Sequence, residues 1–314
     1  MRIELVDGCG PYAISPVSCA TMNKTGMTGC HTELRTKALE TLSGQYPMID
    51  IPGGCRFALD GYDVDVLLRS ESDLIVGFAP RNSIYPAATE APAWGEGFLK
   101  KLGVSAFHVR PKKSCWYLGH DLQGFMRAAS LTGLFSTWNN VMTYGGSMGG
   151  FAALAYARTV SARRVLSMNP QLNLGPSVRT WEDRFPEALE QDWTSDLTRI
   201  DEQVRDVETL VLVYDPYHTQ DRHQVDLMTS PHVIRLQIPF VGHMMATHMK
   251  DLSVPGPVFR QTLRGEIDVQ AFYRQIRGRR HLPKHRSRMT GVARGARKTA
   301  LSSIFAVEVQ STDS

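Results

Sequence analysis

The sequence lacks any long uninterrupted hydrophobic run, which argues against a membrane-spanning helix. Such a helix needs about 20 consecutive apolar residues, and the 314 residues contain no run of that kind although 42% of them are hydrophobic. The N-terminal residues also lack the basic stretch and apolar core of a secretory signal. We therefore expect a cytoplasmic protein built from one large domain with appendages or from two small domains.

Cysteine is also scarce, and its spacing excludes two common uses. The cysteines are odd in number and include no C-x-x-C pair and no zinc-type spacing. The histidines near Asp221, which are His218 and His223, likewise show no known ligand spacing. We therefore expect reduced thiols, no metal and no cofactor. The cysteines are Cys9, Cys19, Cys30, Cys55 and Cys115.

Acidic residues are missing from residues 274–298, a stretch that includes the first part of the basic C-terminal tail, residues 278–314. Ten Lys and Arg and no Asp or Glu lie between Arg274 and Lys298, so the rest of the chain is net acidic although the whole carries +4. We interpret this tail as a solvated, disordered end, with binding to nucleic acid or to an anionic membrane surface as alternatives. No aromatic residue interleaves the arginines between Tyr273 and Phe305, which argues against a base-stacking surface and makes nucleic acid an unlikely partner.

Apolar strand patterns alternate with helical patterns through the middle of the chain. This alternation predicts an α/β fold with a mostly parallel sheet flanked by helices. We expect a catalytic domain over residues 61–250, with a helical insertion or lid at 171–206, and C-terminal helices over 251–277. Residues 1–60 form an N-terminal extension whose structure the pattern does not reveal. The expected strands are 62–69, 73–80, 105–110, 140–144, 163–168, 209–214 and 233–238.

The most informative segment is VMTYGGSMGGFAAL, residues 141–154. Gly145, Ser147 and Gly149 form the G-x-S-x-G pattern of a nucleophile elbow, between a short apolar strand and a helix of small residues. Small residues are needed on both sides of the serine because a Cβ atom there would clash across the sharp turn. A helix-capping role for Ser147 is the alternative interpretation.

Other reactive residues follow later strands, where the carboxyl ends of a parallel sheet gather functional groups. Asp215 follows the strand at 209–214, and His243 follows the last strand. The chain order Ser, Asp, His matches one known catalytic triad order. We favour Asp215 as the acid because it lies at the strand end, and Asp221 is its rival because it can reach the same place from the loop.

On these residues, the chain resembles the α/β-hydrolase-fold serine hydrolases over roughly residues 60–250. The resemblance implies Ser147 as the nucleophile, His243 as the general base and then acid, and an aspartate that orients the imidazole. It also implies an oxyanion hole formed by the N–H of Met148 and a second N–H, from Ala79 or Arg81, because Pro80 has none. No HGGG motif stands there. Arg81 can alternatively meet an anionic substrate or remain a solvated loop residue.

The expected activity is hydrolysis of an ester or thioester through an acyl-enzyme. Two alternatives remain open. The wider pattern, a G-S-M-G-G elbow and a later D-P segment before G-H, is similar to that of bacterial hydrolases found with surface-polysaccharide genes. An acyltransferase or deacetylase acting on a glycan, with the same fold and triad, is one alternative. A non-catalytic binding or scaffold protein of the same fold is the other alternative, and it would require the serine, the histidine and both aspartates to lie too far apart to hydrogen-bond. The expected partner is thus a small-molecule or glycan acyl substrate.

Overall fold

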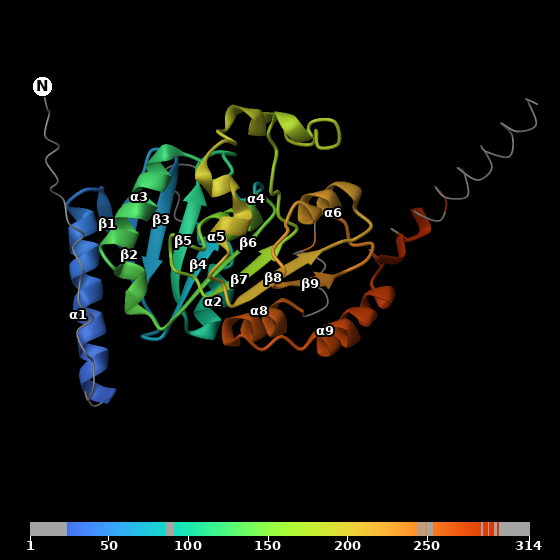
Figure 1. The fold of residues 1–314 in the computed structure, drawn as a ribbon. Helices are drawn as coiled ribbons and strands as arrows, with labels where there is room; N and C mark the ends of the chain where they lie inside the picture. Colours follow the sequence, from blue (N-terminus) through green and yellow to red (C-terminus); the bar gives the residue numbers. More distant parts are fainter. Residues whose placement is uncertain are drawn as a thin grey trace, which may run out of the picture.

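A nine-stranded sheet runs through the protein, with helices on both of its faces (Figure 1). The structure, a computed structural model, describes residues 24–85, 91–243, 245, 249, 254–283, 285–287, 289–291 and 294, and only the backbone of residues 24–30. Its strand order is β1-β2-β3-β5-β4-β6-β7-β8-β9. The strands are β1 (Met48–Ile51), β2 (Gly54–Ala58), β3 (Tyr62–Leu67), β4 (Asp73–Phe78), β5 (Ser105–Pro111), β6 (Asn140–Gly146), β7 (Arg164–Met168), β8 (Thr209–Tyr214) and β9 (Val233–Gln237).

Across the sheet, the pairing of neighbouring strands changes once from antiparallel to parallel. β1, β2, β3 and β5 pair antiparallel, whereas every pairing from β5 through β4 to β9 is parallel. The parallel strands inside the sheet, from β4 to β8, are largely buried on both sides, which explains the nearly continuous apolar sequences of β4 and β8. The edge strand β9 is only partly buried, and its Arg235 is exposed. This architecture confirms the α/β-hydrolase fold class that the sequence predicts.

Successive residues of each strand point to opposite faces and so build two separate cores. In β4, Leu74 and Val76 join one apolar cluster, whereas Ile75 joins the other. The first cluster is covered by α1 (Lys24–Ser43), α3 (His120–Leu131), η1 (Leu134–Thr137), α4 (Met148–Ala155), α5 (Ile200–Gln203) and α6 (Thr219–Asp226). The second is covered by α2 (Glu96–Leu102), α8 (Pro255–Arg264) and α9 (Val269–Ile276).

The structure differs from the sequence-based expectations in two segments. The sheet begins at Met48, within the stretch expected to be an extension separate from the catalytic domain. Residues 171–206 contain mainly short 3₁₀ turns rather than the expected helices. These turns are η2 (Pro176–Val178), η3 (Pro186–Glu190) and η4 (Asp196–Thr198).

Several other expectations fall partly outside the described residues. The expected disorder of the tail concerns residues 278–314, of which the structure describes η5 (Arg277–His281), 282–283 and a few positions up to 294. Cys55 and Cys115 are free thiols, whereas Cys9 and Cys19 and the side chain of Cys30 lie outside the described part. Among the described residues, no helix combines the length and apolar character needed to cross a membrane.

Candidate active site

Ser147 occupies a strained turn between β6 and α4. Its backbone has φ 56° and ψ −119°, an unusual positive φ for a residue with a side chain. The flanking glycines explain how the turn closes. A Cβ atom on Gly145 would lie 2.1 Å from the carbonyl oxygen of Gly149, and one on Gly149 would lie 2.2 Å from the carbonyl oxygen of Phe78. The glycines of the motif therefore permit the close packing that presents Ser147.

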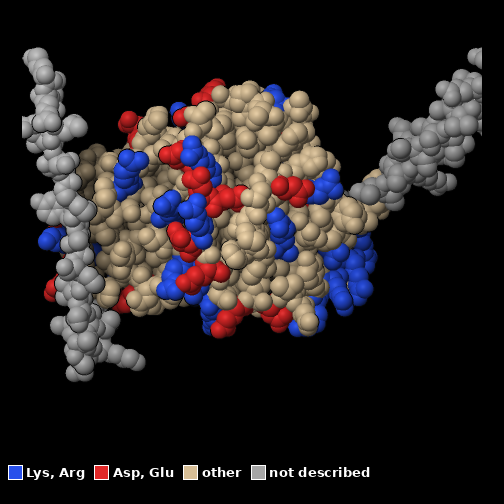
Figure 2. Space-filling view, viewed as in Figure 1, with Lys and Arg blue, Asp and Glu red and all other residues tan. Residues whose placement is uncertain are grey.

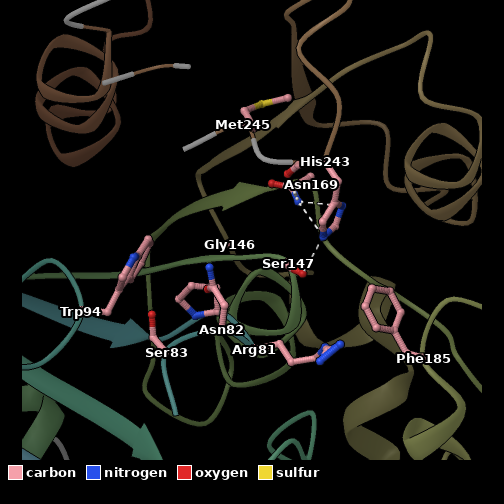
Figure 3. A pocket seen from close by; sticks show the side chains of 11 residues that line it. Arg81, Asn82, Ser83, Trp94, Gly146, Ser147, Asn169, Phe185, His243 and Met245 are labelled. Atoms are coloured by element: carbon pink, nitrogen blue, oxygen red, sulfur yellow. Dashed lines mark hydrogen bonds between the residues drawn. The ribbon is translucent and has the colours of Figure 1, made fainter. Parts of the chain in front are cut away.

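His243 lies directly beside Ser147, although the two residues are far apart in the chain. The Ser147 Oγ is 2.8 Å from His243 Nε2, as the dashed line in Figure 3 marks. His243 follows β9 and comes after Gly242, whose φ of 69° favours glycine. The imidazole is about a quarter exposed, with 23% of its surface accessible, so it can meet both the serine and a molecule entering from solvent.

Asp221 contacts the other nitrogen of the same imidazole. Both of its carboxylate oxygens lie 2.9 Å from His243 Nδ1. Asp221 belongs to the first turn of α6 and its side chain is fully buried. Burial raises the pKa of this carboxyl, but hydrogen bonds and charge from His218 and His243 outweigh it and hold the pKa well below its usual range. An ionised carboxylate only accepts hydrogen bonds, so it favours the imidazole tautomer with hydrogen on Nδ1 and leaves Nε2 free to accept from Ser147.

Asp215 does not touch His243, in contrast to the preferred sequence-based assignment. Its buried carboxylate accepts three backbone N–H groups, from Tyr217 at 2.9 Å, from Phe240 at 3.0 Å and from Gly242 at 2.6 Å. These donors belong to the two turns that follow β8 and β9. Asp215 therefore joins these turns, and the contact that was expected of it is made by its rival Asp221.

Two polar contacts around the histidine were not identified from the sequence. Asn169 Nδ2 donates to the carbonyl oxygen of His243 at 3.0 Å, and it lies 3.1 Å from the imidazole Nδ1. Arg184 Nη1 lies 2.7 Å from Asp221 Oδ1. The position of Asn169 directly after β7 could have indicated its place at this edge of the sheet. No comparable signal marked Arg184, which comes from the irregular segment.

The residues expected to form the oxyanion hole lie next to the elbow. Met148 opens α4, so its N–H has no intrahelical acceptor. Ala79 follows β4 and packs close to the elbow, because a Cβ on Gly149 would lie 2.7 Å from its carbonyl oxygen. The side chain of Arg81 is 43% exposed and lies 3.5 Å from Glu187, with its guanidinium over the Phe185 ring.

A cavity of about 350 Å³ opens over Ser147 (Figure 3). Its wall combines aromatic rings with short polar side chains, a composition suited to a small acyl or alcohol group. Within the described residues, no group of three or more His, Cys, Asp or Glu side chains could hold a metal ion. The cavity is lined by Pro80, Arg81, Asn82, Ser83, Trp94, Gly146, Ser147, Asn169, Phe185, His243 and Met245.

Comparisons with known proteins found similar solved structures at low sequence identity. No family model matches the chain, and no curated protein matches it. A capsule O-acetyltransferase of Neisseria meningitidis serogroup A is 13% identical, over 71% of this chain and 99% of that chain, with a TM-score of 0.47. A hyperthermophilic esterase from Pyrobaculum calidifontis is 13% identical, over 76% and 93%, with a TM-score of 0.42. Est1E from Butyrivibrio proteoclasticus is 14% identical, over 70% and 99%, with a TM-score of 0.40. We assign no residue role from these similarities.

Proposed function

We propose that this protein is a serine-dependent enzyme that transfers the acyl group of an ester or thioester to water. One observation carries the proposal. Ser147, His243 and Asp221 form a continuous chain of contacts, with 2.8 Å from Ser147 Oγ to His243 Nε2 and 2.9 Å from His243 Nδ1 to Asp221. Nucleophile, base and orienting acid within hydrogen-bond reach are the arrangement that acyl transfer requires.

In the acylation step, His243 Nε2 takes the proton of Ser147 as the serine oxygen bonds to the substrate carbonyl carbon. The carbonyl oxygen becomes negative, and the free N–H of Met148 at the start of α4 can donate to it. The bond to the leaving group then breaks, and this group takes the proton from Nε2. The ionised Asp221 stabilises the imidazolium that exists between the two proton transfers.

In the deacylation step, water attacks the acyl-enzyme, and the two proton transfers through His243 occur again, the second one returning the proton to Ser147. His243 Nε2 takes a proton from the water, whose oxygen attacks the acyl carbon, and returns the proton to Ser147 as the acyl bond breaks. A sugar hydroxyl in place of water would make the protein a glycan acyltransferase with the same residues. The distances argue against the non-catalytic alternative, because its condition that these groups lie too far apart is not met.

The test compares Ser147→Ala with a serine control. Wild-type protein is expected to hydrolyse p-nitrophenyl acetate and to be labelled by a fluorophosphonate. Ser147→Ala should lower hydrolysis by at least about a thousandfold and abolish labelling, because the hydroxyl that contacts His243 Nε2 is lost. Ser43→Ala, on α1 outside the cavity, should behave like the wild type.

Undiminished labelling of Ser147→Ala would remove this serine as the nucleophile. The assay is repeated with added oligosaccharide to identify the acyl acceptor. Acetate released at an unchanged rate supports hydrolysis, whereas acetylated sugar at the expense of acetate supports the transferase alternative.

A further inference from the structure

Arg184 joins two buried carboxylates behind the proposed triad. Its guanidinium contacts Asp221 through Nη1 at 2.7 Å and Glu182 through Nε at 2.7 Å and Nη2 at 2.5 Å. Both carboxylate side chains are fully buried, and 19% of the Arg184 side chain is exposed. An arginine fork fixed by two buried carboxylates has little freedom to move.

The same short segment forms one wall of the cavity. Phe185 follows Arg184 in the chain, lies 5.2 Å from its guanidinium carbon and lines the cavity beside His243 (Figure 3). The Phe185 and His243 ring centroids are 6.2 Å apart. The cavity wall and the acid of the triad are therefore tied through one side chain.

We propose that Arg184 is a positioning residue that fixes Asp221 and the Phe185 wall relative to each other and counters the negative charge behind His243. The proposal rests on the proposed function, in which Asp221 orients His243. In this role Arg184 affects the reaction indirectly, through its contact with Asp221.

The charge arrangement gives this role a measurable consequence. With Arg184 present, one cation separates two buried carboxylates. Without it, both carboxylates act on the histidine unopposed and favour the protonated imidazole, which cannot take the proton of Ser147. The other charged or titratable groups around His243 are His218 at the start of α6, Arg81 at the cavity and Asp215, which accepts the Gly242 N–H.

The experiment compares three changes at this position. Arg184→Met removes the charge and keeps much of the side-chain length, and Arg184→Lys keeps the charge but loses the fork. The double change Arg184→Met with Glu182→Gln removes a cation and an anion together, so it leaves one buried carboxylate at Asp221. Arg163→Met is the matched control because Arg163 forms a similar pair with Glu208 on the surface, where both side chains are about half exposed.

Two measurements are made on each variant. The first is the pH dependence of kcat/KM for p-nitrophenyl acetate from about pH 5 to about pH 9. The second is the pH at which His243 titrates, followed by NMR of protein with labelled histidine. The NMR measurement needs no activity, so it separates failure of this inference from failure of the proposed function.

Arg184→Met is expected to lower kcat/KM at neutral pH by about tenfold to a hundredfold. Both its acid limb and the histidine titration should move to higher pH by roughly half a unit to two units. Arg184→Lys should keep the pH profile and lose activity severalfold. The double change should keep part of the upward shift, because Arg184 contacts Asp221 directly and Glu182 does so only through Arg184.

A folded Arg184→Met protein with wild-type activity and titration would overturn the inference. A double variant with fully restored activity and histidine titration would also overturn it, because Arg184 would then serve only to neutralise Glu182. If Arg184→Met does not fold, the inference is tested on Arg184→Lys and on the double variant, with the same pH profile and histidine titration. If all variants including the wild type lack activity but the histidine titration shifts as expected, the proposed function fails and the electrostatic role of Arg184 stands.

Discussion

Asp215 and Asp221 serve the same histidine in different ways. Asp221 accepts from the imidazole itself, whereas Asp215 accepts the N–H of Gly242 and so orders the backbone that carries His243. The amide that Asp221→Asn introduces can donate a hydrogen bond to Nδ1 and so favours the tautomer that cannot take the proton of Ser147. We therefore expect Asp221→Asn to lower kcat by about ten-thousandfold, measured by ester hydrolysis.

Asp215→Asn is the matched comparison. The amide keeps one accepting oxygen but turns its NH₂ group toward a backbone donor, which should lower the free energy of unfolding by about 1–3 kcal/mol. Activity should fall far less than for Asp221→Asn, because the contact between Asp221 and His243 remains. Urea unfolding and ester hydrolysis of both variants test this division, and an inactive Asp215→Asn beside an active Asp221→Asn would reverse it.

The strand-end pattern predicted from sequence that Ser147 and His243 lie together, but it favoured Asp215, which does not contact the imidazole. Ser147 and His243 follow β6 and β9 closely, so the sheet alone brings them to one edge. The choice between two aspartates depends on how the turn after β8 directs each side chain. Three backbone donors surround Asp215, and such donors leave no trace in the sequence.

At the scale of elements, the elbow depends on close contact between α4 and β4. A Cβ atom at Gly149 would lie 2.2 Å from the carbonyl oxygen of Phe78, and this backbone atom cannot move away as a flexible side chain could. Gly149→Ala should therefore push the helix from the strand and lower the free energy of unfolding by about 3 kcal/mol. Fluorophosphonate labelling of Ser147 should slow at the same time, since the turn that presents it is displaced.

Gly97→Ala is the control for this change. Gly97 lies inside α2, and a Cβ atom there would meet nothing within 4 Å. Alanine favours the helix, so this change should raise the free energy of unfolding by up to about 1 kcal/mol and leave labelling unchanged. Equal effects of the two substitutions in thermal unfolding and labelling would show that crowding at the elbow is not what requires glycine.

In the segment at 171–206, the sequence pattern predicted the wrong type of secondary structure. Its polar and aromatic pattern favoured helices, yet prolines start two of its turns, at Pro176 and Pro186. Trp193 fixes another part by donating from Nε1 to the carbonyl oxygen of Ala188 at 2.7 Å while its ring packs on Phe151. Long-range packing of this kind overrides local propensity, and it also explains why β1 and β2 were not recognised, since they form by pairing with β3.

At the scale of the whole molecule, the charges of the surface differ in arrangement from those of the site. Figure 2 shows acidic and basic side chains mixed with one another, mainly in a band near the centre of the visible face and along its lower edge, with a group of basic side chains near the C-terminal helices. η5 contributes Arg279 and Arg280 to that end of the chain. The buried charges are instead held by direct contacts with specific partners, as Arg184 is by Glu182 and Asp221. Surface charge is screened by salt, whereas these buried contacts are screened much less.

Stability at acid pH should report the ionisation of two carboxyl groups, Asp221 and Glu96. Burial raises the pKa of Glu96, but contacts with His108 and Arg69 outweigh it, and the net pKa is lowered, as it is for Asp221. A carboxyl with a lowered folded-state pKa adds stability that is complete above its unfolded-state pKa of about 4. That stability is lost as the pH falls through the folded-state value, because the unfolded chain then binds more protons than the folded one.

We therefore expect the free energy of unfolding from urea titrations to change little through these groups above about pH 5 and to fall steeply below about pH 4. In the acid range, the Asp221 carboxyl binds a proton in the unfolded chain but stays ionised in the folded protein. Asp221→Asn removes this group, so the free energy of unfolding of the variant should depend less steeply on pH there. The wild type and the variant are compared in the same buffers at fixed ionic strength. A variant with an equal or steeper acid dependence would mean that Asp221 is not held ionised by its contacts with His243 and His218 in the folded protein.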